Sequence, residues 1–108
     1  MANNWNIPKW LEEETRSRDK TCVYCGAEFT PSHVSMKTCA SWEHIINDTS
    51  IITRENIVLC CVSCNASKGQ KKLEEWLKSS FCVEKGITES SVATVVQNAL
   101  HRGRITCS

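Results

Sequence analysis

Four of the eight cysteines in this 108-residue chain form two Cys-x-x-Cys pairs, Cys22 with Cys25 and Cys61 with Cys64. Four thiolates at this spacing can close a tetrahedral structural zinc site. Eight cysteines in a short chain could instead form a disulfide framework, but nothing in the sequence directs secretion to the compartments where disulfides persist. The paired spacing therefore favours a structural Zn²⁺ ion.

An imidazole, a carboxylate and an amide lie between and beside the two cysteine pairs. Glu43 and His44 are adjacent, and Asn65 follows directly after Cys64. If zinc uses the four sulfurs, these three side chains are available for other chemistry. An isolated Glu-His pair usually has no catalytic role, and its position between the cysteine pairs is what favours one here. The pattern indicates a catalytic site held together by zinc.

Length and composition predict one small domain, covering residues 1–108. A chain of this size buries a modest fraction of its surface, so a bound metal would add noticeably to its stability. Four of the seven aromatic residues are tryptophans, Trp5, Trp10, Trp42 and Trp76, and we expect them to anchor the core. The net charge is only +1, so a nucleic-acid-binding function would have to rest on local clusters of basic residues.

The chain contains no apolar stretch of membrane-spanning length, and its first residues lack the pattern of a signal peptide. These features predict a cytoplasmic protein without a membrane partner. The sequence shows no periodic repeat and no linker long enough to separate domains.

The elements that would position the candidate site follow the order strand, loop, strand, helix. Residues 39–46 contain β-formers and could present Glu43 and His44 on opposite faces of a strand. A turn at 47–50 and a second extended segment at 51–59 complete a predicted hairpin. Residues 65–79 fit an amphipathic helix with basic positions in its first two turns.

Two further helices are predicted at the ends of the chain. Proline at position 8 and the acidic residues after it fit the start of a helix over about 8–18. Apolar positions at helical spacing after Thr88 predict a last helix over about 89–101. The sequence thus predicts an α+β fold, with a hairpin-plus-helix core between two flanking helices.

Together these motifs resemble the HNH endonuclease family over about residues 22–69. The matching segments, in chain order, are Cys22-Val-Tyr-Cys25-Gly, Glu43-His44-Ile-Ile, Glu55-Asn56-Ile-Val-Leu59 and Cys61-Val-Ser-Cys64-Asn65-Ala-Ser-Lys68-Gly69. Each motif alone is weak, but their order and spacing together are specific. The resemblance implies the ββα-metal fold for a core over about residues 22–78.

The resemblance also implies roles for individual residues. His44 matches the histidine that activates water, a task that suits imidazole because it titrates near neutral pH. Glu43 and Asn65 match the protein ligands of one catalytic divalent ion, and their hard oxygen atoms suit Mg²⁺ or Mn²⁺. Hydrolysis of a DNA phosphodiester bond would follow, with the ion stabilising the charge on the phosphate and the leaving oxygen.

Asn56 matches the family's middle asparagine, which fixes the loop and orients the histidine. Lys68, and with it Lys71, would meet substrate phosphate, although lysines on a helix also commonly form a solvated face. The sequence departs from the family pattern at two positions: Glu43 stands where aspartate is commoner, and Asn47 stands where proline often follows the histidine. Neither departure removes a functional group.

Three hypotheses from different functional classes remain open. The first is a metal-dependent endonuclease that contacts the DNA backbone with little base recognition. The second is a zinc-binding module that binds nucleic acid without catalysis. The third is a zinc-stabilised protein-interaction domain. The sequence leaves open whether the protein is a monomer or a homodimer.

Overall fold

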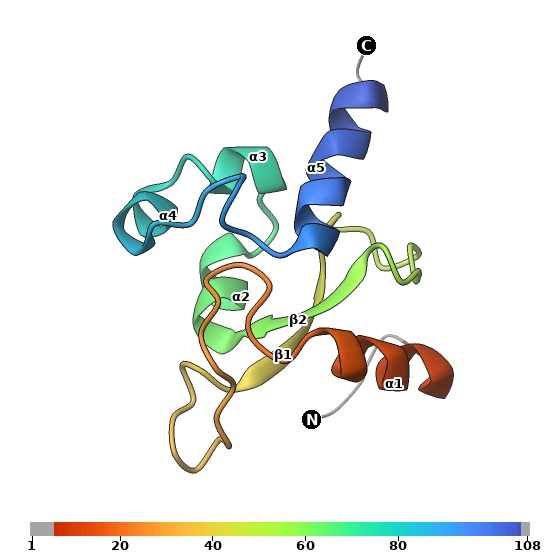
Figure 1. Ribbon diagram of the computed structural model, residues 1–108, viewed down its shortest axis with the longest axis vertical. Coiled ribbons are helices and arrows are strands. Elements are labelled where there is room, and N and C mark those ends of the chain that lie inside the picture. The colour runs from red at the N-terminus through yellow and green to blue at the C-terminus, as the bar shows by residue number, and fades with distance from the viewer. Residues whose placement is uncertain (1–5, 107–108) are drawn as a thin grey trace.

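The computed structural model describes residues 6–106, without the side chains of 103–106, so Trp5 and Cys107 lie outside the described residues. Two strands and five helices follow one another in a small α+β fold (Figure 1): α1 (Lys9–Arg18), β1 (Ala40–His44), β2 (Ile57–Cys61), α2 (Val62–Lys68), α3 (Leu73–Trp76), α4 (Ser80–Lys85) and α5 (Thr94–Thr106). The predicted α+β class is confirmed.

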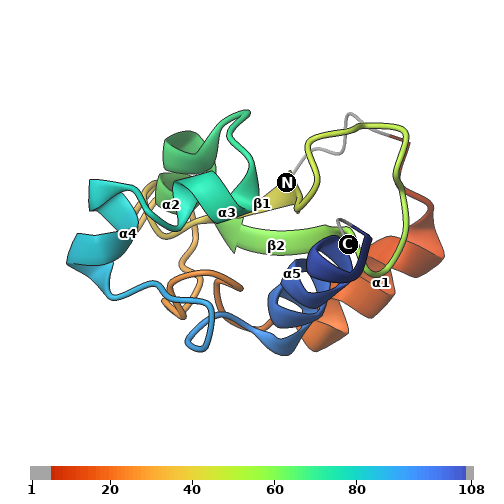
Figure 2. The ribbon, with the colours of Figure 1, turned by 90° about the horizontal axis from the view of Figure 1, so that it is seen from above.

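The two strands form an antiparallel hairpin in which Ala40 pairs with Cys61 and His44 pairs with Ile57. The hairpin lies between α2 on one side and α1 on the other (Figure 2). The predicted second strand began at residue 51, but the structure keeps residues 45–56 as a connecting segment and starts β2 at Ile57. Asn56 explains the difference. Its side chain forms hydrogen bonds with backbone groups inside the connecting segment, at Ile46 and Ile51, where a strand would have formed a ladder with its neighbour.

Residues 57–60 of β2 alternate between two hydrophobic clusters, because successive strand residues point to opposite faces. Val58 and Cys60 belong to the larger cluster, which includes Trp76 and residues of α5. Ile57 and Leu59 belong to the smaller one, with Trp42 and residues of α1. The larger cluster has these buried members: Cys22, Val23, Tyr24, Ile45, Val58, Cys60, Cys61, Cys64, Leu73, Trp76, Cys82, Ile87, Val92, Val96 and Leu100.

The tryptophan prediction holds for two of the three residues that the structure describes. Trp42 and Trp76 are buried, with 3% and 0% of their surface exposed. Trp10 is 54% exposed on α1 and was wrongly expected in the core. The Arg54 guanidinium lies 5.7 Å from the centre of its ring, which is a common use for a surface aromatic.

Helix α1 agrees with the predicted helix over 8–18, but the single helix predicted over 65–79 was wrong. Helix α2 ends at Lys68, because Gly69 adopts φ +50°, in the region that side-chain-bearing residues avoid. The chain restarts as α3, and α4 then follows Ser79, whose hydroxyl accepts a hydrogen bond from the N–H of Cys82. These short helices carry Leu73, Trp76 and Cys82 into the larger cluster.

The last helix begins and ends later than predicted. Thr88 closes a turn instead of capping a helix: its hydroxyl accepts from the N–H of Ser91, and the Ser91 hydroxyl accepts from the N–H of Thr88. Helix α5 then runs from Thr94 to Thr106, where the prediction was about 89–101. Among the described residues, no helix has the length and apolar character needed to cross a bilayer.

The outer edge of β2 is closed by Arg18 at the end of α1 and by residues that follow it. The backbone N–H and carbonyl of Leu59 point away from β1. The N–H donates to the Asp19 carboxylate at 3.0 Å, and the carbonyl accepts from the N–H of Val23 at 3.3 Å. The carbonyl of Ile57, two residues away, accepts from the Arg18 guanidinium at 2.8 Å. Asp19 is 6% exposed and also pairs with Arg18, so one buried carboxylate joins the end of α1 to the sheet.

Replacing Asp19 by Ala is expected to lower the free energy of unfolding by about 2 kcal/mol, because a buried N–H and a guanidinium lose a charged acceptor. Urea unfolding followed by circular dichroism measures the change. Glu13→Ala, on the exposed face of the same helix, is the matched control and should stay within about 0.5 kcal/mol of the parent protein. Equal losses in both variants would contradict the proposed role of Asp19.

Candidate metal centre and catalytic site

The four cysteines of the two Cys-x-x-Cys pairs come together in space. The sulfurs of Cys22, Cys25, Cys61 and Cys64 all lie within 4.8 Å of one another, and Cys25 Sγ lies 3.8 Å from Cys61 Sγ. A tetrahedral zinc ion with Zn–S bonds of about 2.3 Å holds its sulfurs about 3.8 Å apart. No disulfide joins the cysteines of the described part of the chain. The four cysteines are thus placed to bind a metal ion, and their type and spacing are consistent with zinc.

Backbone N–H groups turn toward the first sulfur of each pair. The N–H of Cys25 donates to Cys22 Sγ at 3.5 Å, and the N–H of Cys64 donates to Cys61 Sγ at 3.4 Å. Gly26, with φ +79°, reverses the chain after the first pair, and the second pair spans the end of β2 and the first turn of α2. The cluster therefore ties the β2–α2 junction to the turn that follows α1.

The charges of four neighbouring thiols argue for a cation among them. Hydrogen bonds from the thiols of Cys61 and Cys64 lower the pKa of Cys22 to about 2, so one thiolate is favoured. The hydrogen bond with Cys22 raises the pKa of Cys61 to about 11, and the Cys22 and Cys61 contacts together with burial raise the pKa of Cys64. The negative charge of this first thiolate disfavours ionisation of the other thiols. A divalent cation bound among the sulfurs would offset that charge and favour their ionisation.

Cys60 could have competed with Cys61 for the metal, but it lies outside the cluster. Its side chain is completely buried on the larger hydrophobic cluster, 3.8 Å from the hydroxyl of Ser41. Burial raises the pKa of the Cys60 thiol, which keeps it neutral. The alternation of strand residues explains the choice, because it turns adjacent cysteines to opposite sides of β2.

Helix α2 docks on the outer edge of β1 through Asn65 and Lys68, which share one face of the helix at i, i+3 spacing. Trp42 pairs with Leu59, whose polar backbone groups point outward, so the Trp42 and His44 carbonyls also point away from β2. The Trp42 carbonyl accepts from Asn65 Nδ2 at 3.2 Å, and the His44 carbonyl accepts from Lys68 Nζ at 3.4 Å. Asn65 and Lys68 thus close the free edge of the strand that carries Glu43 and His44.

The Glu43 carboxylate is buried against α2 and already has a cationic partner. Its Oε2 lies 2.9 Å from Lys68 Nζ and accepts from the Tyr24 hydroxyl at 3.2 Å. Burial raises the pKa of Glu43, and the Lys68 ammonium opposes that rise. Burial and the Glu43 charge also raise the pKa of Tyr24, so its hydroxyl stays a hydrogen-bond donor. The carboxylate is held as an anion by one ammonium and one phenol.

His44 ends β1 and is 5% exposed. Burial lowers the pKa of its imidazole and the Lys68 charge adds to this effect, whereas Asp48 raises it. The ring is therefore neutral near pH 7, which is the form that can accept a proton. Glu43 pairs with Val58 and His44 with Ile57, and successive residues of a strand point to opposite faces.

Asn56 fixes the segment between the strands. Its Oδ1 accepts from the N–H of Ile46 at 2.7 Å, and its Nδ2 donates to the carbonyls of Ile46 at 3.2 Å and Ile51 at 3.0 Å. The carbonyl of Asn56 also accepts from the N–H of Ile45 at 3.0 Å. Asn56 is thus bonded to Ile46, which lies two residues after His44, and to Ile51 further along the segment.

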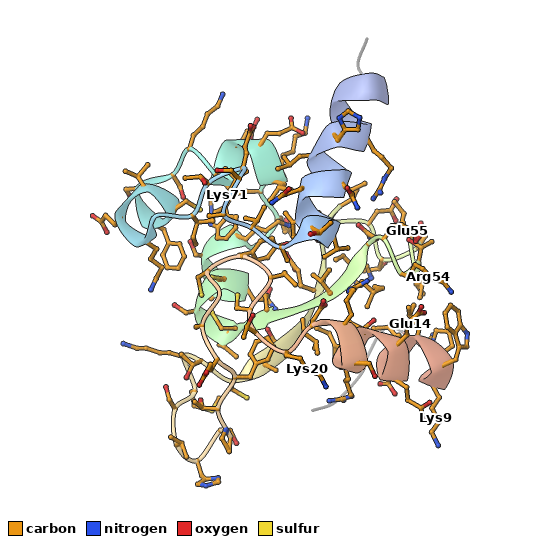
Figure 3. All side chains as sticks on the ribbon, viewed as in Figure 1. Lys9, Glu14, Lys20, Arg54, Glu55 and Lys71 are labelled. Carbon is orange, nitrogen blue, oxygen red and sulfur yellow. The ribbon has the colours of Figure 1, made fainter. Side chains whose placement is uncertain are left out.

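The positions of the two candidate phosphate-binding lysines differ. Lys68 has no exposed surface, so its expected contact with substrate phosphate does not agree with its place in the structure. Lys71 is exposed near α3, where its Nζ donates to the Ser67 carbonyl at 3.1 Å (Figure 3). Helical periodicity explains the difference, because Lys68 lies on the strand-facing side of α2 and Lys71 lies beyond its end.

Two residues that contact Glu43 and Asn65, namely Tyr24 and Ser41, could not have been found from the sequence. Tyr24 lies inside the first cysteine pair, and nothing in its spacing indicates a bond to Glu43. Ser41 accepts from Asn65 Nδ2 at 3.0 Å and donates to the Cys60 carbonyl at 3.0 Å, which adds a second anchor for the amide. With both bonds made by Nδ2, the Asn65 side chain keeps its carbonyl oxygen for another partner.

Substitution of Cys64 by Ser is expected to remove about one equivalent of bound zinc and to unfold the domain, because a four-sulfur zinc site contributes on the order of 10 kcal/mol to folding. Elemental analysis and far-ultraviolet circular dichroism measure the two effects. Cys39→Ser is the matched control, since Cys39 lies outside the cluster, and it should keep both zinc and fold. Full zinc content in Cys64→Ser would contradict the assignment.

Comparison with known proteins gives a nuclease-like relationship. The chain is 30% identical over 95 residues to the CRISPR-associated endonuclease Cas9 of Corynebacterium diphtheriae. The match covers 85% of this chain but only 8% of that much longer protein. No family model matches the chain, and no solved structure matches it. The similarity, together with the four-cysteine cluster, supports a relationship to part of an endonuclease.

Proposed function

We propose that this chain is an HNH-type endonuclease domain with a ββα-metal core, and that it hydrolyses phosphodiester bonds in DNA. The observation that carries the proposal is the junction of β1 with α2, where Glu43, His44 and Asn65 lie on two elements that the four-cysteine cluster and the edge contacts hold together. The similarity to a segment of an endonuclease supports the same activity.

In the proposed reaction, His44 takes a proton from the attacking water as general base. Its lowered pKa keeps the imidazole neutral and ready to accept that proton. Asn56 holds the segment after His44 and so limits the positions that the imidazole can take. The ring is only 5% exposed and lies at the strand position after Glu43, on the opposite face, so the proposed reaction requires a local rearrangement at the end of β1 that brings both side chains to one phosphate.

Glu43 and Asn65 would hold one Mg²⁺ or Mn²⁺ ion, which when bound supplies positive charge for the phosphate and the leaving oxygen. The donor types fit a hard cation, since one is a carboxylate and the other an amide whose oxygen is left available by the bonds of Nδ2. In the ion-free protein the cationic partner of Glu43 is Lys68, whose Nζ lies 2.9 Å from Glu43 Oε2.

A second candidate function is a zinc-binding module that binds nucleic acid without cutting it. The burial of Glu43 favours this alternative. This residue is 6% exposed, and its Oε2 already contacts Lys68 Nζ and accepts a hydrogen bond from the Tyr24 hydroxyl. Such a module would bind DNA equally well with and without the His44 imidazole. It would also show no strand scission in the presence of Mg²⁺.

Replacement of His44 by Ala is expected to lower the rate of plasmid nicking by about 100- to 10,000-fold, the usual contribution of a general base. The assay follows conversion of supercoiled to open-circular DNA with Mg²⁺, Mn²⁺ or neither ion. The matched control is His33→Ala, at an exposed position of the loop between α1 and β1, which should keep the parent rate.

Equal nicking by His44→Ala and the parent protein would overturn the assignment of the base. Absence of nicking by the parent protein, combined with DNA binding that survives His44→Ala, would favour the non-catalytic module. Absence of both binding and nicking would favour the protein-interaction hypothesis.

A further inference from the structure

Lys68 is the cationic partner of the Glu43 carboxylate, the group proposed above to bind a divalent ion. Its Nζ lies 2.9 Å from Glu43 Oε2, and Lys68 has no exposed surface. A divalent ion bound to the same oxygen would lie about 2.1 Å from it. Two cations at one carboxylate oxygen in a buried site repel each other strongly, because little water is present to screen them.

We propose that Lys68 and a divalent ion exchange at Glu43, so that ion binding expels the Lys68 ammonium from the interior. The inference rests on the proposed function, because it takes Glu43 as a ligand of the ion. Lys68 serves as the resident counter-ion of Glu43 in the ion-free protein, where an unpaired buried carboxylate would be costly. The exchange replaces one positive partner by another and keeps the carboxylate ionised.

The Lys68 ammonium also forms hydrogen bonds with the backbone at His44, the proposed general base. Lys68 Nζ donates to the carbonyl of Ile45 at 3.0 Å and to that of His44 at 3.4 Å. When Lys68 leaves Glu43, both carbonyls lose their donor and the end of β1 is released from α2. Ion binding and the local opening that His44 needs would then be one event, with Lys68 acting as a positioning residue.

Coupling between two ligands of one site is reciprocal. If the Lys68 ammonium weakens ion binding by some factor, a bound ion weakens the burial of Lys68 by the same factor. Coupling of this kind typically amounts to about 5- to 150-fold. The exchange can therefore be measured as a change in the accessibility of the Lys68 amine, without any assay of DNA cleavage.

Amine acetylation of the zinc-loaded parent protein, read residue by residue by mass spectrometry, tests the exchange. Lys68 is expected to be protected in magnesium-free buffer and to react at least about fivefold faster at saturating Mg²⁺. Lys72, exposed at the start of α3, is the matched control and should react at one rate in both buffers. Unchanged protection of Lys68 at saturating Mg²⁺ would overturn the exchange.

Mn²⁺ binding measured by electron paramagnetic resonance separates the exchange from the function on which it rests. Lys68→Met, an unbranched apolar replacement, is expected to bind Mn²⁺ about 5- to 150-fold more tightly than the parent protein. Glu43→Gln should bind it much more weakly, because the carboxylate is lost.

The outcomes of these measurements are distinct. Binding of Mn²⁺ that depends on Glu43, with an affinity unchanged in Lys68→Met, would overturn the exchange and leave the ion site intact. Equal Mn²⁺ binding by the parent protein and Glu43→Gln would remove Glu43 as an ion ligand and overturn both proposals. The labelling experiment uses the unaltered protein, so it remains decisive if the Lys68 variant does not fold.

Discussion

The place of α2 against β1 depends on the four-cysteine cluster at the start of the helix. Cys61 ends β2 and Cys64 lies in the first turn of α2, so a metal ion bound by both would fix the direction in which the helix leaves the sheet. A chain of 108 residues has a limited hydrophobic core, and a bound metal is an effective substitute for missing buried area. One face of the helix meets the free edge of β1, and the backbone contacts of Asn65 and Lys68 lie along that edge.

Polar side chains, and not further strands, satisfy the edges of this two-stranded sheet. Asn65 and Lys68 bond the outward carbonyls of β1, while Arg18 and Asp19 bond the outward groups of β2. An unpaired backbone carbonyl or N–H group in the interior costs free energy comparable to a lost hydrogen bond, so these side chains are needed for the hairpin to be buried between helices. The consequence for function is that residues expected at a catalytic site also serve as structural supports.

The buried Glu43–Lys68 pair connects stability with the proposed activity. An ion pair without exposure is weak support for stability by itself, because removing both charges from water offsets much of their attraction. Its value here lies in keeping a carboxylate ionised in the interior, beside the backbone of the candidate base. The burial of Glu43 and His44 also distinguishes the two proposed functions. An enzyme must expose these side chains to substrate, whereas a non-catalytic binding module need not.

The sequence by itself determined the four metal ligands, the hairpin, α1 and the chemical types at the candidate site, because cysteine spacing, strand alternation and helix-start signals are local properties of the chain. The sequence prediction missed the end of α2 at Lys68, although a glycine at position 69 is a local signal for the end of a helix, and it missed the two short helices that follow. Only the tertiary structure decided that Lys68 lies inside, bound to Glu43 and to the end of β1, and not on a solvated or phosphate-facing surface. The reason is that a lysine at this position faces either water or the strand edge according to how the helix is docked, and the docking is set by contacts between residues distant in the sequence.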